Sequence, residues 1–316
     1  MDEHVKGNGV PCLTLGEREH EEKLLQPFAH LTQEPGMQIL TRVSSAYNYW
    51  LKVPADKLIA LKDIGYIIHH SCVLIDDIQD NTLLRRGIPV AHSIYGVAST
   101  LNTAIYLLLK GLKRAQILNN PDAIALCIEH LLDMYYGQGL DICWRDNNTC
   151  PSLEEYMQMI QKKAAVWLFK IGLLQLLSDN KIDFTKLNSI LAMYIQIRDD
   201  YCNLCLQQYT DERGYCEDIT EGKLSFPIIH AIRRHPDDQQ VIHILRQRTR
   251  DVELKKYCFT LLEKFGSFSY TRHILKELDA EARAEVAKLG GNPVLENVLN
   301  ELLDWKKDED DKNPEQ

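Results

Sequence analysis

Proline and glycine are scarce in this sequence, at 11 and 16 of 316 residues. A protein built from many short strands needs frequent turns, which such a composition does not supply. Apolar residues instead recur every three or four positions, the spacing of an amphipathic helix. We therefore predict a single all-α domain of ten or more helices over residues 19–304, with disordered charged ends at 1–18 and 305–316. The spacing is clearest in segments 55–80, 120–143, 152–178, 183–208, 225–233, 237–248, 252–264 and 268–288.

An excess of positive charge is also missing. Asp and Glu number 45 against 36 Lys and Arg, which gives a formal net charge of −9. Nucleic-acid binders need basic faces that displace counterions from phosphates, so we expect no nucleic-acid partner. An acidic protein can still bind an anionic substrate, but it then needs divalent metal ions and a few well-placed basic side chains.

No apolar run is long enough to cross a membrane. The most apolar stretch, AAVWLFKIGLLQLL, has 14 residues and contains Lys170, whereas a spanning helix needs about 20. The first 22 residues lack the apolar core of a signal peptide. The nine cysteines are odd in number and lie mostly in apolar stretches, as reduced cysteines do. The CxxC pair at Cys202 and Cys205 has no second pair of zinc ligands beside it. These features predict a cytoplasmic protein without a transmembrane segment.

Acidic side chains gather at the end of the apolar helix predicted over 55–80. Asp76 and Asp80 are four residues apart and share one helical face, while Asp77 lies about 100° round the axis. Two like charges at this spacing destabilise a bare helix by a few tenths of a kcal/mol, on the order of 0.2–0.5. A divalent cation would reverse that penalty, and oxygen ligands without His or Cys suit Mg²⁺.

A second acidic cluster follows another apolar helix. Asp199 and Asn203 are four residues apart, and Asp200 is adjacent. Either cluster alone is equally well explained as a solvated helix end. Two acidic clusters that each follow an apolar helix favour a metal site over a chance arrangement.

Basic residues accompany both clusters. Arg binds phosphate with a planar fork and Lys as a point charge, and no GxxxxGK[ST] phosphate loop is present. Metal ions on carboxylates, together with several cations, describe a diphosphate-binding site. The candidate cations are Arg85, Arg86, Lys162, Lys163 and Lys223.

At this point the sequence resembles the trans-isoprenyl diphosphate synthase family, and within it the animal geranylgeranyl diphosphate synthases. The resemblance covers residues from about 22 to 295. It is carried by NYWLKVP (48–54), LIDDIQDN with LRRGIPVAHSIYG (74–96), GQGLDICWRDN with TCPSLEEY (137–156), QIRDDYCNL (196–204), CEDITEGKLSFPIIHAI (216–232), LRQRT (245–249) and GSFSYTR (266–272).

The resemblance implies an isoprenoid synthase helical bundle around a deep central cavity, associated into homo-oligomers through its helices. It also implies a prenyl diphosphate substrate and three Mg²⁺ ions, where Asp76, Asp80 and Asp199 are the implied ligands and Asp77 and Asp200 support them. The positions implied to hold the allylic diphosphate are Arg85, Lys162, Gln196 and Lys223. Those implied to contact the second substrate, isopentenyl diphosphate, are His69 and Arg86. A lysine is usual in the family where this chain has Arg213.

The sequence departs from the family at the diphosphate site of the second substrate. The usual pattern Gly-Lys-x-x-Arg is here Gly36-Met37-Gln38-Ile39-Leu40. Each charge-assisted hydrogen bond to phosphate contributes roughly 1.5–3 kcal/mol. Losing two would weaken binding by about two to four powers of ten. Arg42 cannot replace them, because two residues further on a helix it points about 200° away. The family's Gln-Lys-Thr is read here as Gln161-Lys162-Lys163, followed by Ala164 and Ala165 in place of two glycines.

Three functions remain open. A terpene synthase, which ionises an allylic diphosphate without coupling it, best fits a retained metal site and a damaged acceptor site. A geranylgeranyl diphosphate synthase with a rearranged acceptor site is the alternative, since His69 and Arg86 remain. A non-catalytic partner subunit fits poorly, because it has no reason to keep paired like charges. The small residues Ser71 and Cys72 favour a deep cavity for a C15 or C20 chain, although Tyr135 and Tyr136 could shorten it.

Overall fold

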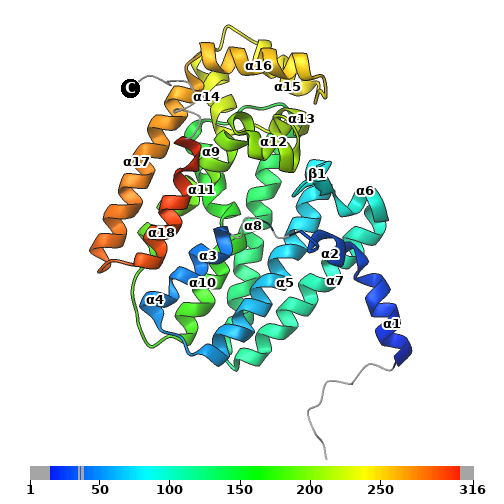
Figure 1. Ribbon diagram of the computed structural model, residues 1–316, viewed down its shortest axis with the longest axis vertical. Coiled ribbons are helices and arrows are strands. Elements are labelled where there is room, and N and C mark those ends of the chain that lie inside the picture. The colour runs from blue at the N-terminus through cyan, green and yellow to red at the C-terminus, as the bar shows by residue number, and fades with distance from the viewer. Residues whose placement is uncertain (1–14, 35, 37–38, 307–316) are drawn as a thin grey trace, which may run out of the picture.

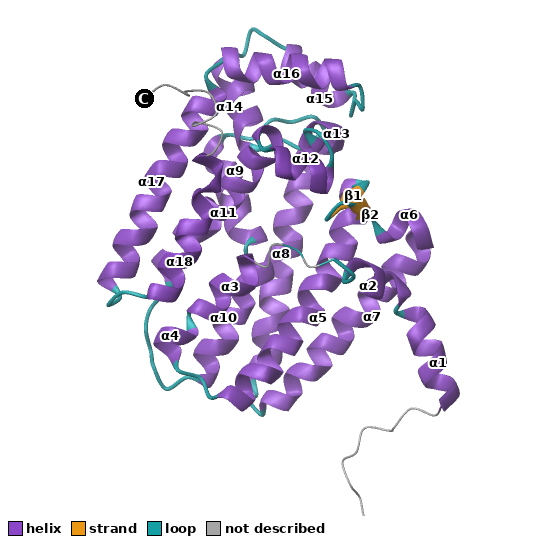
Figure 2. Cartoon of the chain, in the orientation of Figure 1, coloured by secondary structure: helices purple, strands orange, loops and turns teal. Residues whose placement is uncertain are grey.

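The computed structural model describes residues 15–34, 36 and 39–306, and within them it confirms the predicted all-α class (Figures 1 and 2). Long helices form the centre of the bundle. Helix α5 packs against α7 and α10, α8 packs against α9 and α10, and α11 packs against α17. Their bounds are α5 (Ala55–Asp80), α7 (Val97–Ala115), α8 (Asp122–Asp146), α9 (Leu153–Lys163), α10 (Ala165–Leu177), α11 (Thr185–Cys205) and α17 (Ser267–Lys288).

Shorter helices surround this centre. The group α14 to α16 lies over one end of the bundle, and α17 runs along its side (Figure 1). The remaining elements are α1 (Leu15–Leu24), α2 (Gln26–Leu31), α3 (Ile39–Ala46), α4 (Asn48–Leu51), α6 (Ala91–Tyr95), η1 (Gln116–Leu118), α12 (Gln207–Arg213), α13 (Glu217–Glu221), α14 (Phe226–Arg234), α15 (Gln240–Arg246), α16 (Val252–Lys264), α18 (Pro293–Glu301) and η2 (Leu302–Lys306).

The end of α5 sets the position of the first acidic cluster. The helix ends at Asp80, and its C-cap residue Asn81 adopts a left-handed conformation (φ 54°) that Asn tolerates better than most residues. Asp76, Asp77 and Asp80 therefore occupy its last turns. A two-residue antiparallel hairpin follows, β1 (Leu84–Arg85) and β2 (Ile88–Pro89), with Leu84 opposite Pro89. This hairpin turns the chain so that Arg85 folds back onto α5.

The segment predicted as one helix over 152–178 is divided in two. Helix α9 starts with a capping box in which Ser152 and Glu155 satisfy each other's backbone amides. It ends at Lys163, and α10 starts at Ala165. At the crossing with α8, a Cβ on Gly137 would lie 2.9 Å from the Lys163 nitrogen. Only glycine permits this close approach, so the crossing fixes which face of α9 points inward.

The helical body extends slightly beyond the predicted boundaries of 19 and 304. Helix α1 already begins at Leu15. Trp305 is fully buried, and its Nε1 donates to the hydroxyl of Tyr194 at 3.4 Å. Residues 1–14 and 307–316 of the two predicted disordered ends lie outside the described residues.

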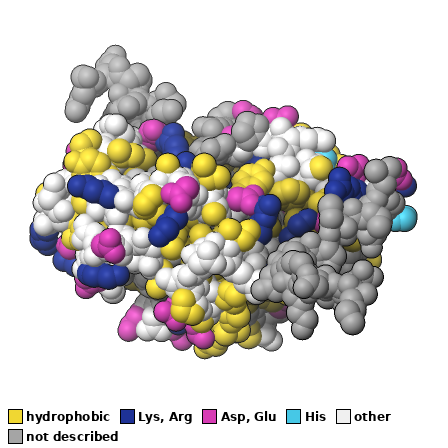
Figure 3. Space-filling view, turned by 90° about the horizontal axis from the view of Figure 1, so that it is seen from below, with side chains coloured by type: hydrophobic (Ala, Val, Ile, Leu, Met, Phe, Trp, Pro, Cys, Tyr) yellow, Lys and Arg dark blue, Asp and Glu magenta, His cyan; other side chains and the backbone are white. Residues whose placement is uncertain are grey.

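Two features concern the predicted partners: the distribution of charge on the surface and the apolar character of the central helix α5. Seen from below, hydrophobic side chains are interspersed with charges of both signs (Figure 3). Helix α5 is long and apolar enough to cross a membrane, but 56% of its most apolar window is buried inside the fold. Burial of this kind is expected for the central helix of a bundle.

Candidate active site

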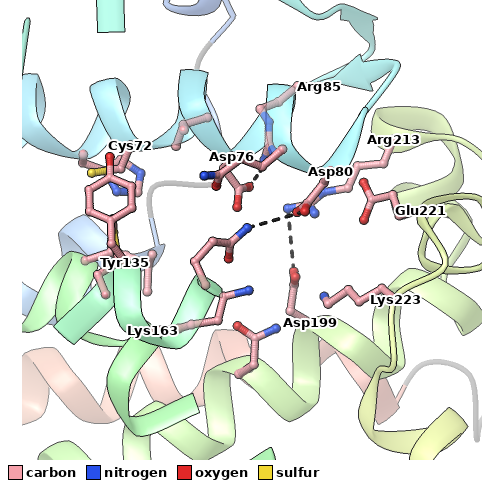
Figure 4. Close-up of a pocket in the computed structure, with 18 residues that line it drawn as sticks. Cys72, Asp76, Asp80, Arg85, Tyr135, Lys163, Asp199, Arg213, Glu221 and Lys223 are labelled. Carbon is pink, nitrogen blue, oxygen red and sulfur yellow. Dashed lines mark hydrogen bonds and ion pairs between the residues drawn. The ribbon is translucent and has the colours of Figure 1, made fainter. Parts of the chain in front are cut away.

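The two acidic clusters face one another across a cavity of about 220 Å³. Figure 4 shows Asp76 and Asp80 projecting from one wall toward Asp199 and Lys223 on the opposite wall. The shared cavity supports the prediction that the clusters form one site. The lining residues are Leu40, His69, Cys72, Val73, Asp76, Gln79, Asp80, Arg85, Met134, Tyr135, Gln138, Lys163, Val166, Gln196, Asp199, Arg213, Glu221 and Lys223.

The three carboxylates of the first cluster take different positions. Asp76 and Asp80 line the cavity, whereas Asp77 is buried behind them at 1% exposure. Arg85 bridges the cluster: its Nε donates to Asp77 at 2.5 Å, and its Nη2 donates to Asp76 at 3.3 Å. Asp77 therefore positions the Arg85 guanidinium at the cavity wall.

Asp80 lies in a strained electrostatic environment. It accepts a hydrogen bond from Arg145 at 2.8 Å, yet burial and the nearby charge of Asp76 raise the pKa of Asp80 to about 6. The raised pKa means that ionised Asp80 is short of positive charge. A divalent cation between Asp76 and Asp80 would supply it.

In the second cluster, Asp199 faces the cavity and Asp200 does not. Burial opposes ionisation of Asp199, but Arg213 and then Lys223 hold its pKa below the ordinary value. The hydroxyl of Tyr209 also donates to Asp199 at 2.9 Å. Asp199 is therefore a carboxylate at neutral pH, as a metal ligand must be.

Asp200 and Asn203 serve the structure around Asp199. Asp200 is fully buried and accepts from the Phe226 amide at 2.8 Å and Lys223 Nζ at 3.1 Å. Gln196 also donates to it at 2.9 Å. Asn203 accepts from the Asp218 amide at 3.0 Å and does not line the cavity. Of the i, i+4 pair in this cluster, only Asp199 thus faces the cavity.

The donor set fits Mg²⁺ shared with a ligand. Within the described residues, no three His, Cys, Asp or Glu side chains converge on one point. Mg²⁺ is usually held by one or two carboxylates plus phosphate oxygens and water, and does not require a cage made only of protein. Asp76, Asp80 and Asp199 provide such partial ligand sets on two walls.

The structure corrects the assignment of Lys162. Its side chain is 45% exposed and pairs with Asp133 at 2.7 Å, outside the cavity. The cavity is lined by Lys163, whose Nζ donates to Asp141 at 2.7 Å. The close approach at Gly137 accompanies this orientation, so Lys163, and not Lys162, is the lysine at the cavity wall. Gln161 bonds Ser189 instead.

This correction gives a matched pair of variants. Replacing Lys163 with Met removes a cation at the cavity wall, and we expect the catalytic rate to fall by roughly 10²-fold. Replacing Lys162 with Met removes only an exposed ion pair, which contributes little, so its rate should stay within about twofold of wild type. Steady-state kinetics on both purified variants would check this. A larger loss in Lys162→Met than in Lys163→Met would contradict the assignment.

The side of the cavity predicted to hold isopentenyl diphosphate is poor in available charge. Leu40 lines the cavity, while Met37 lies outside the described residues. Arg42 forms an ion pair with Glu301 on α18, which agrees with its predicted orientation. The acceptor side therefore gains no replacement cation from the described residues of α3.

Arg86 and His69, the two residues predicted to contact isopentenyl diphosphate, also offer no free positive charge to the cavity. Arg86 Nη1 donates to the carbonyl oxygens of Leu31 and Glu34 at 3.0 and 2.7 Å, and Arg86 does not line the cavity. His69 does line it, but burial and then the charge of Lys170 hold its pKa well below the ordinary value. His69 is thus neutral at pH 7 and adds no positive charge.

Several residues in and around the cavity were not predicted from the sequence. Gln138, Asp141 and Arg145 lie on one face of α8 at spacings of three and four, which is a detectable signal. Gln138 approaches Asp80 at 3.5 Å, and Asp141 holds Lys163. Glu221, which accepts from Thr82 at 2.9 Å, carried no such signal because it lies on the five-residue helix α13.

The arrangement, two acidic walls and four cations around one cavity in an all-α bundle, fits a diphosphate ligand. The polyprenyl synthetase family model matches residues 21–262. The chain belongs to this family, which confirms the resemblance found in the sequence.

Individual relatives are similar over nearly the whole chain. A terpene synthase from Matsumurasca onukii is 59% identical over 291 residues, covering 92% of this chain and 96% of its own length. A geranylgeranyl pyrophosphate synthase from Mucor circinelloides f. lusitanicus is 42% identical over 287 residues, covering 90% of this chain and 95% of its own length. A geranylgeranyl pyrophosphate synthase from Metarhizium anisopliae is 42% identical over 287 residues, covering 90% and 87%.

Proposed function

We propose that this chain is a magnesium-dependent terpene synthase that ionises geranyl, farnesyl or geranylgeranyl diphosphate and releases pyrophosphate. The observation that carries the proposal is the contrast between the two sides of the cavity. Carboxylates and cations surround the place for an allylic diphosphate. On the acceptor side, Leu40 is apolar, Arg86 bonds backbone carbonyls and His69 is neutral. The relative named terpene synthase, at 59% identity, supports the same assignment.

The residues of the donor side can perform the ionisation. Asp76, Asp80 and Asp199 would hold the magnesium ions, for which we propose a number of three. Magnesium supplies positive charge to the departing pyrophosphate. Arg85, Lys163, Arg213 and Lys223 add fixed cations around the same oxygens, while Gln196 positions Asp200. Such preorganised charges stabilise the leaving group as the carbon–oxygen bond breaks.

The apolar part of the cavity would hold the resulting cation away from water. It is lined by Cys72, Val73, Met134, Tyr135 and Val166. A cation without a bound coupling partner, whether or not it first cyclises, loses a proton to the released pyrophosphate or captures water with loss of a proton to it, which gives a hydrocarbon or an alcohol.

A geranylgeranyl diphosphate synthase is the second candidate, because several relatives carry that name and His69 still faces the cavity. Product analysis separates the functions. The purified protein with Mg²⁺ receives each allylic diphosphate alone, and then together with isopentenyl diphosphate. We expect terpene products from an allylic diphosphate alone. Elongated diphosphates formed only with both substrates would establish the synthase, and no turnover in any mixture would indicate a partner subunit.

Tyr135 sets the length of the chain that the cavity accepts. Of the two small residues expected to deepen the cavity, Ser71 faces α7 and donates to the Ala104 carbonyl, so only Cys72 lines it. Tyr135, from α8, lies beside Cys72 in the apolar part of the cavity (Figure 4). The phenol ring of Tyr135 therefore occupies the space that the small side chain of Cys72 leaves open.

Removing this ring should lengthen the accepted substrate. We expect Tyr135→Ala to raise the ratio of kcat/KM for geranylgeranyl diphosphate to kcat/KM for geranyl diphosphate by roughly tenfold or more, because removing the ring makes room for the far end of the longer prenyl chain. Tyr136→Ala is the matched control, because Tyr136 is 63% exposed and does not line the cavity. Competition assays with mixed substrates would measure the ratio. An unchanged ratio in Tyr135→Ala would place the end of the cavity elsewhere.

We further propose a cytoplasmic homo-oligomer. The eight cysteines within the described residues form no disulfide, which suits a reducing compartment. An apolar stripe is exposed on the neighbouring helices α7 and α8, and stripes of this kind mark association surfaces. Its members are Val97, Leu101, Ile105 and Leu109 on α7 and Ile128, Leu132 and Tyr136 on α8.

A further inference from the structure

A second cavity lies on the other side of His69. Its volume is about 220 Å³, and residues of α3, α4, α5 and α10 enclose it. His69 lines both cavities, so the second adjoins the acceptor side of the first. Its lining residues are Thr41, Ser44, Ser45, Asn48, Leu58, Leu61, Lys62, Tyr66, His69, His70, Lys170 and Leu174. None of them is acidic.

Lys170 is the unusual member of this set. It is the lysine inside the apolar helix α10, and only 5% of it is exposed. Its stem passes Gly65, where an added Cβ would lie 3.0 Å from Lys170 Cε. Among the described residues, its ammonium has no hydrogen-bond or ion-pair partner. Burial lowers the pKa of Lys170 to about 8, so the amine remains mostly charged at neutral pH.

The groups around Lys170 can hydrogen-bond a bound anion, but none of them carries a negative charge that would neutralise the lysine. His69 and His70 are both kept neutral, mainly by burial. His70 Nδ1 is bonded to the Tyr66 carbonyl at 2.9 Å, while the buried Nδ1 of His69 has no partner within the described part of the chain. Hydroxyl and amide side chains, including Thr41, Ser45 and Asn48, complete the polar part of the lining.

We propose that the second cavity binds a small anion with a short apolar body, whose carboxylate or phosphate group pairs with Lys170. A buried charge without a counter-charge destabilises the fold, and a bound anion would remove that penalty. Leu58, Leu61 and Leu174 offer contacts to the apolar body. The cavity is smaller than the roughly 300–1,000 Å³ typical of drug-sized ligands, so the ligand is a small molecule. This inference does not depend on the proposed function.

Calorimetric titration without Mg²⁺ tests the proposal with three probes: 3-methylbutanoate, 3-methylbutyl phosphate and inorganic phosphate. The proteins are the wild type, Lys170→Met, and Lys57→Met as a control with the same charge change at an exposed site on α5. We expect at least one apolar anion to bind wild type and Lys57→Met, with affinity at least tenfold weaker in Lys170→Met. The carboxylate and phosphate probes separate the two headgroup classes.

Two further measurements show whether the anion binds in this cavity. Lys163→Met should retain binding, because Lys163 lines only the first cavity; loss there with retention in Lys170→Met would overturn the proposal. Without a probe, Lys170→Met should melt at a higher temperature than wild type, since an unpaired buried charge is removed. A lower melting temperature, or equal probe affinity in wild type and Lys170→Met, would also overturn it.

Discussion

Replacing Asp76 with Ala is expected to lower the rate of pyrophosphate release by roughly 10³-fold or more, because the charge that stabilises the leaving group is anchored there. The same change removes one of two like charges on a helical face, so the fold should keep its stability or gain a few tenths of a kcal/mol, about 0.2–0.5. The variant should thus lose activity without losing stability. Kinetics and thermal unfolding of the same preparation would show this.

Asp63→Ala is the matched control for this variant. Asp63 lies on the same helix, is half exposed and pairs with Arg114 away from the cavity. Its rate should match wild type. Chelation of divalent metal with EDTA should reproduce the Asp76→Ala defect in wild type and be reversed by added Mg²⁺. Undiminished turnover in Asp76→Ala would remove the metal assignment for the first cluster.

The second large effect concerns the acceptor side. Restoring cations with Leu40→Arg and Met37→Lys should let the protein bind isopentenyl diphosphate and elongate prenyl chains. Each charge-assisted hydrogen bond contributes roughly 1.5–3 kcal/mol, so the pair should tighten binding by about two to four powers of ten. Leu40 already lines the cavity, and Leu40→Arg alone should give part of the gain.

Elongated product in the presence of both substrates is the measurement for these variants. Leu40→Met, which keeps an apolar side chain, is the control and should elongate no better than wild type. Elongation by wild type equal to that of the double variant would contradict this prediction, because Leu40 and Met37 would then not limit binding of isopentenyl diphosphate.

The fold followed from the sequence because its signals are local. Apolar spacing over 55–80 predicted α5 at its observed bounds, and the two acidic clusters were found from their positions at helix ends. The choice between Lys162 and Lys163 could not be made this way, since adjacent residues on a helix differ by only about 100°. The crossing at Gly137 decides it, and that contact joins residues 26 apart in the chain.

The acceptor side shows a second limit of sequence reasoning. Arg86 is present, as the family pattern requires, but its guanidinium is bonded to carbonyls 52 and 55 residues away. His69 is likewise present but neutral because of burial and Lys170. The residue types alone suggested a partly retained site. Their tertiary contacts indicate that neither supplies a free cation.

The most direct test is the rate of pyrophosphate release from farnesyl diphosphate, measured with and without saturating isopentenyl diphosphate. A chain that ionises its substrate on its own should release pyrophosphate at rates that agree within about twofold in the two conditions. Release that starts only when isopentenyl diphosphate is added, together with a longer prenyl diphosphate as product, would contradict the account.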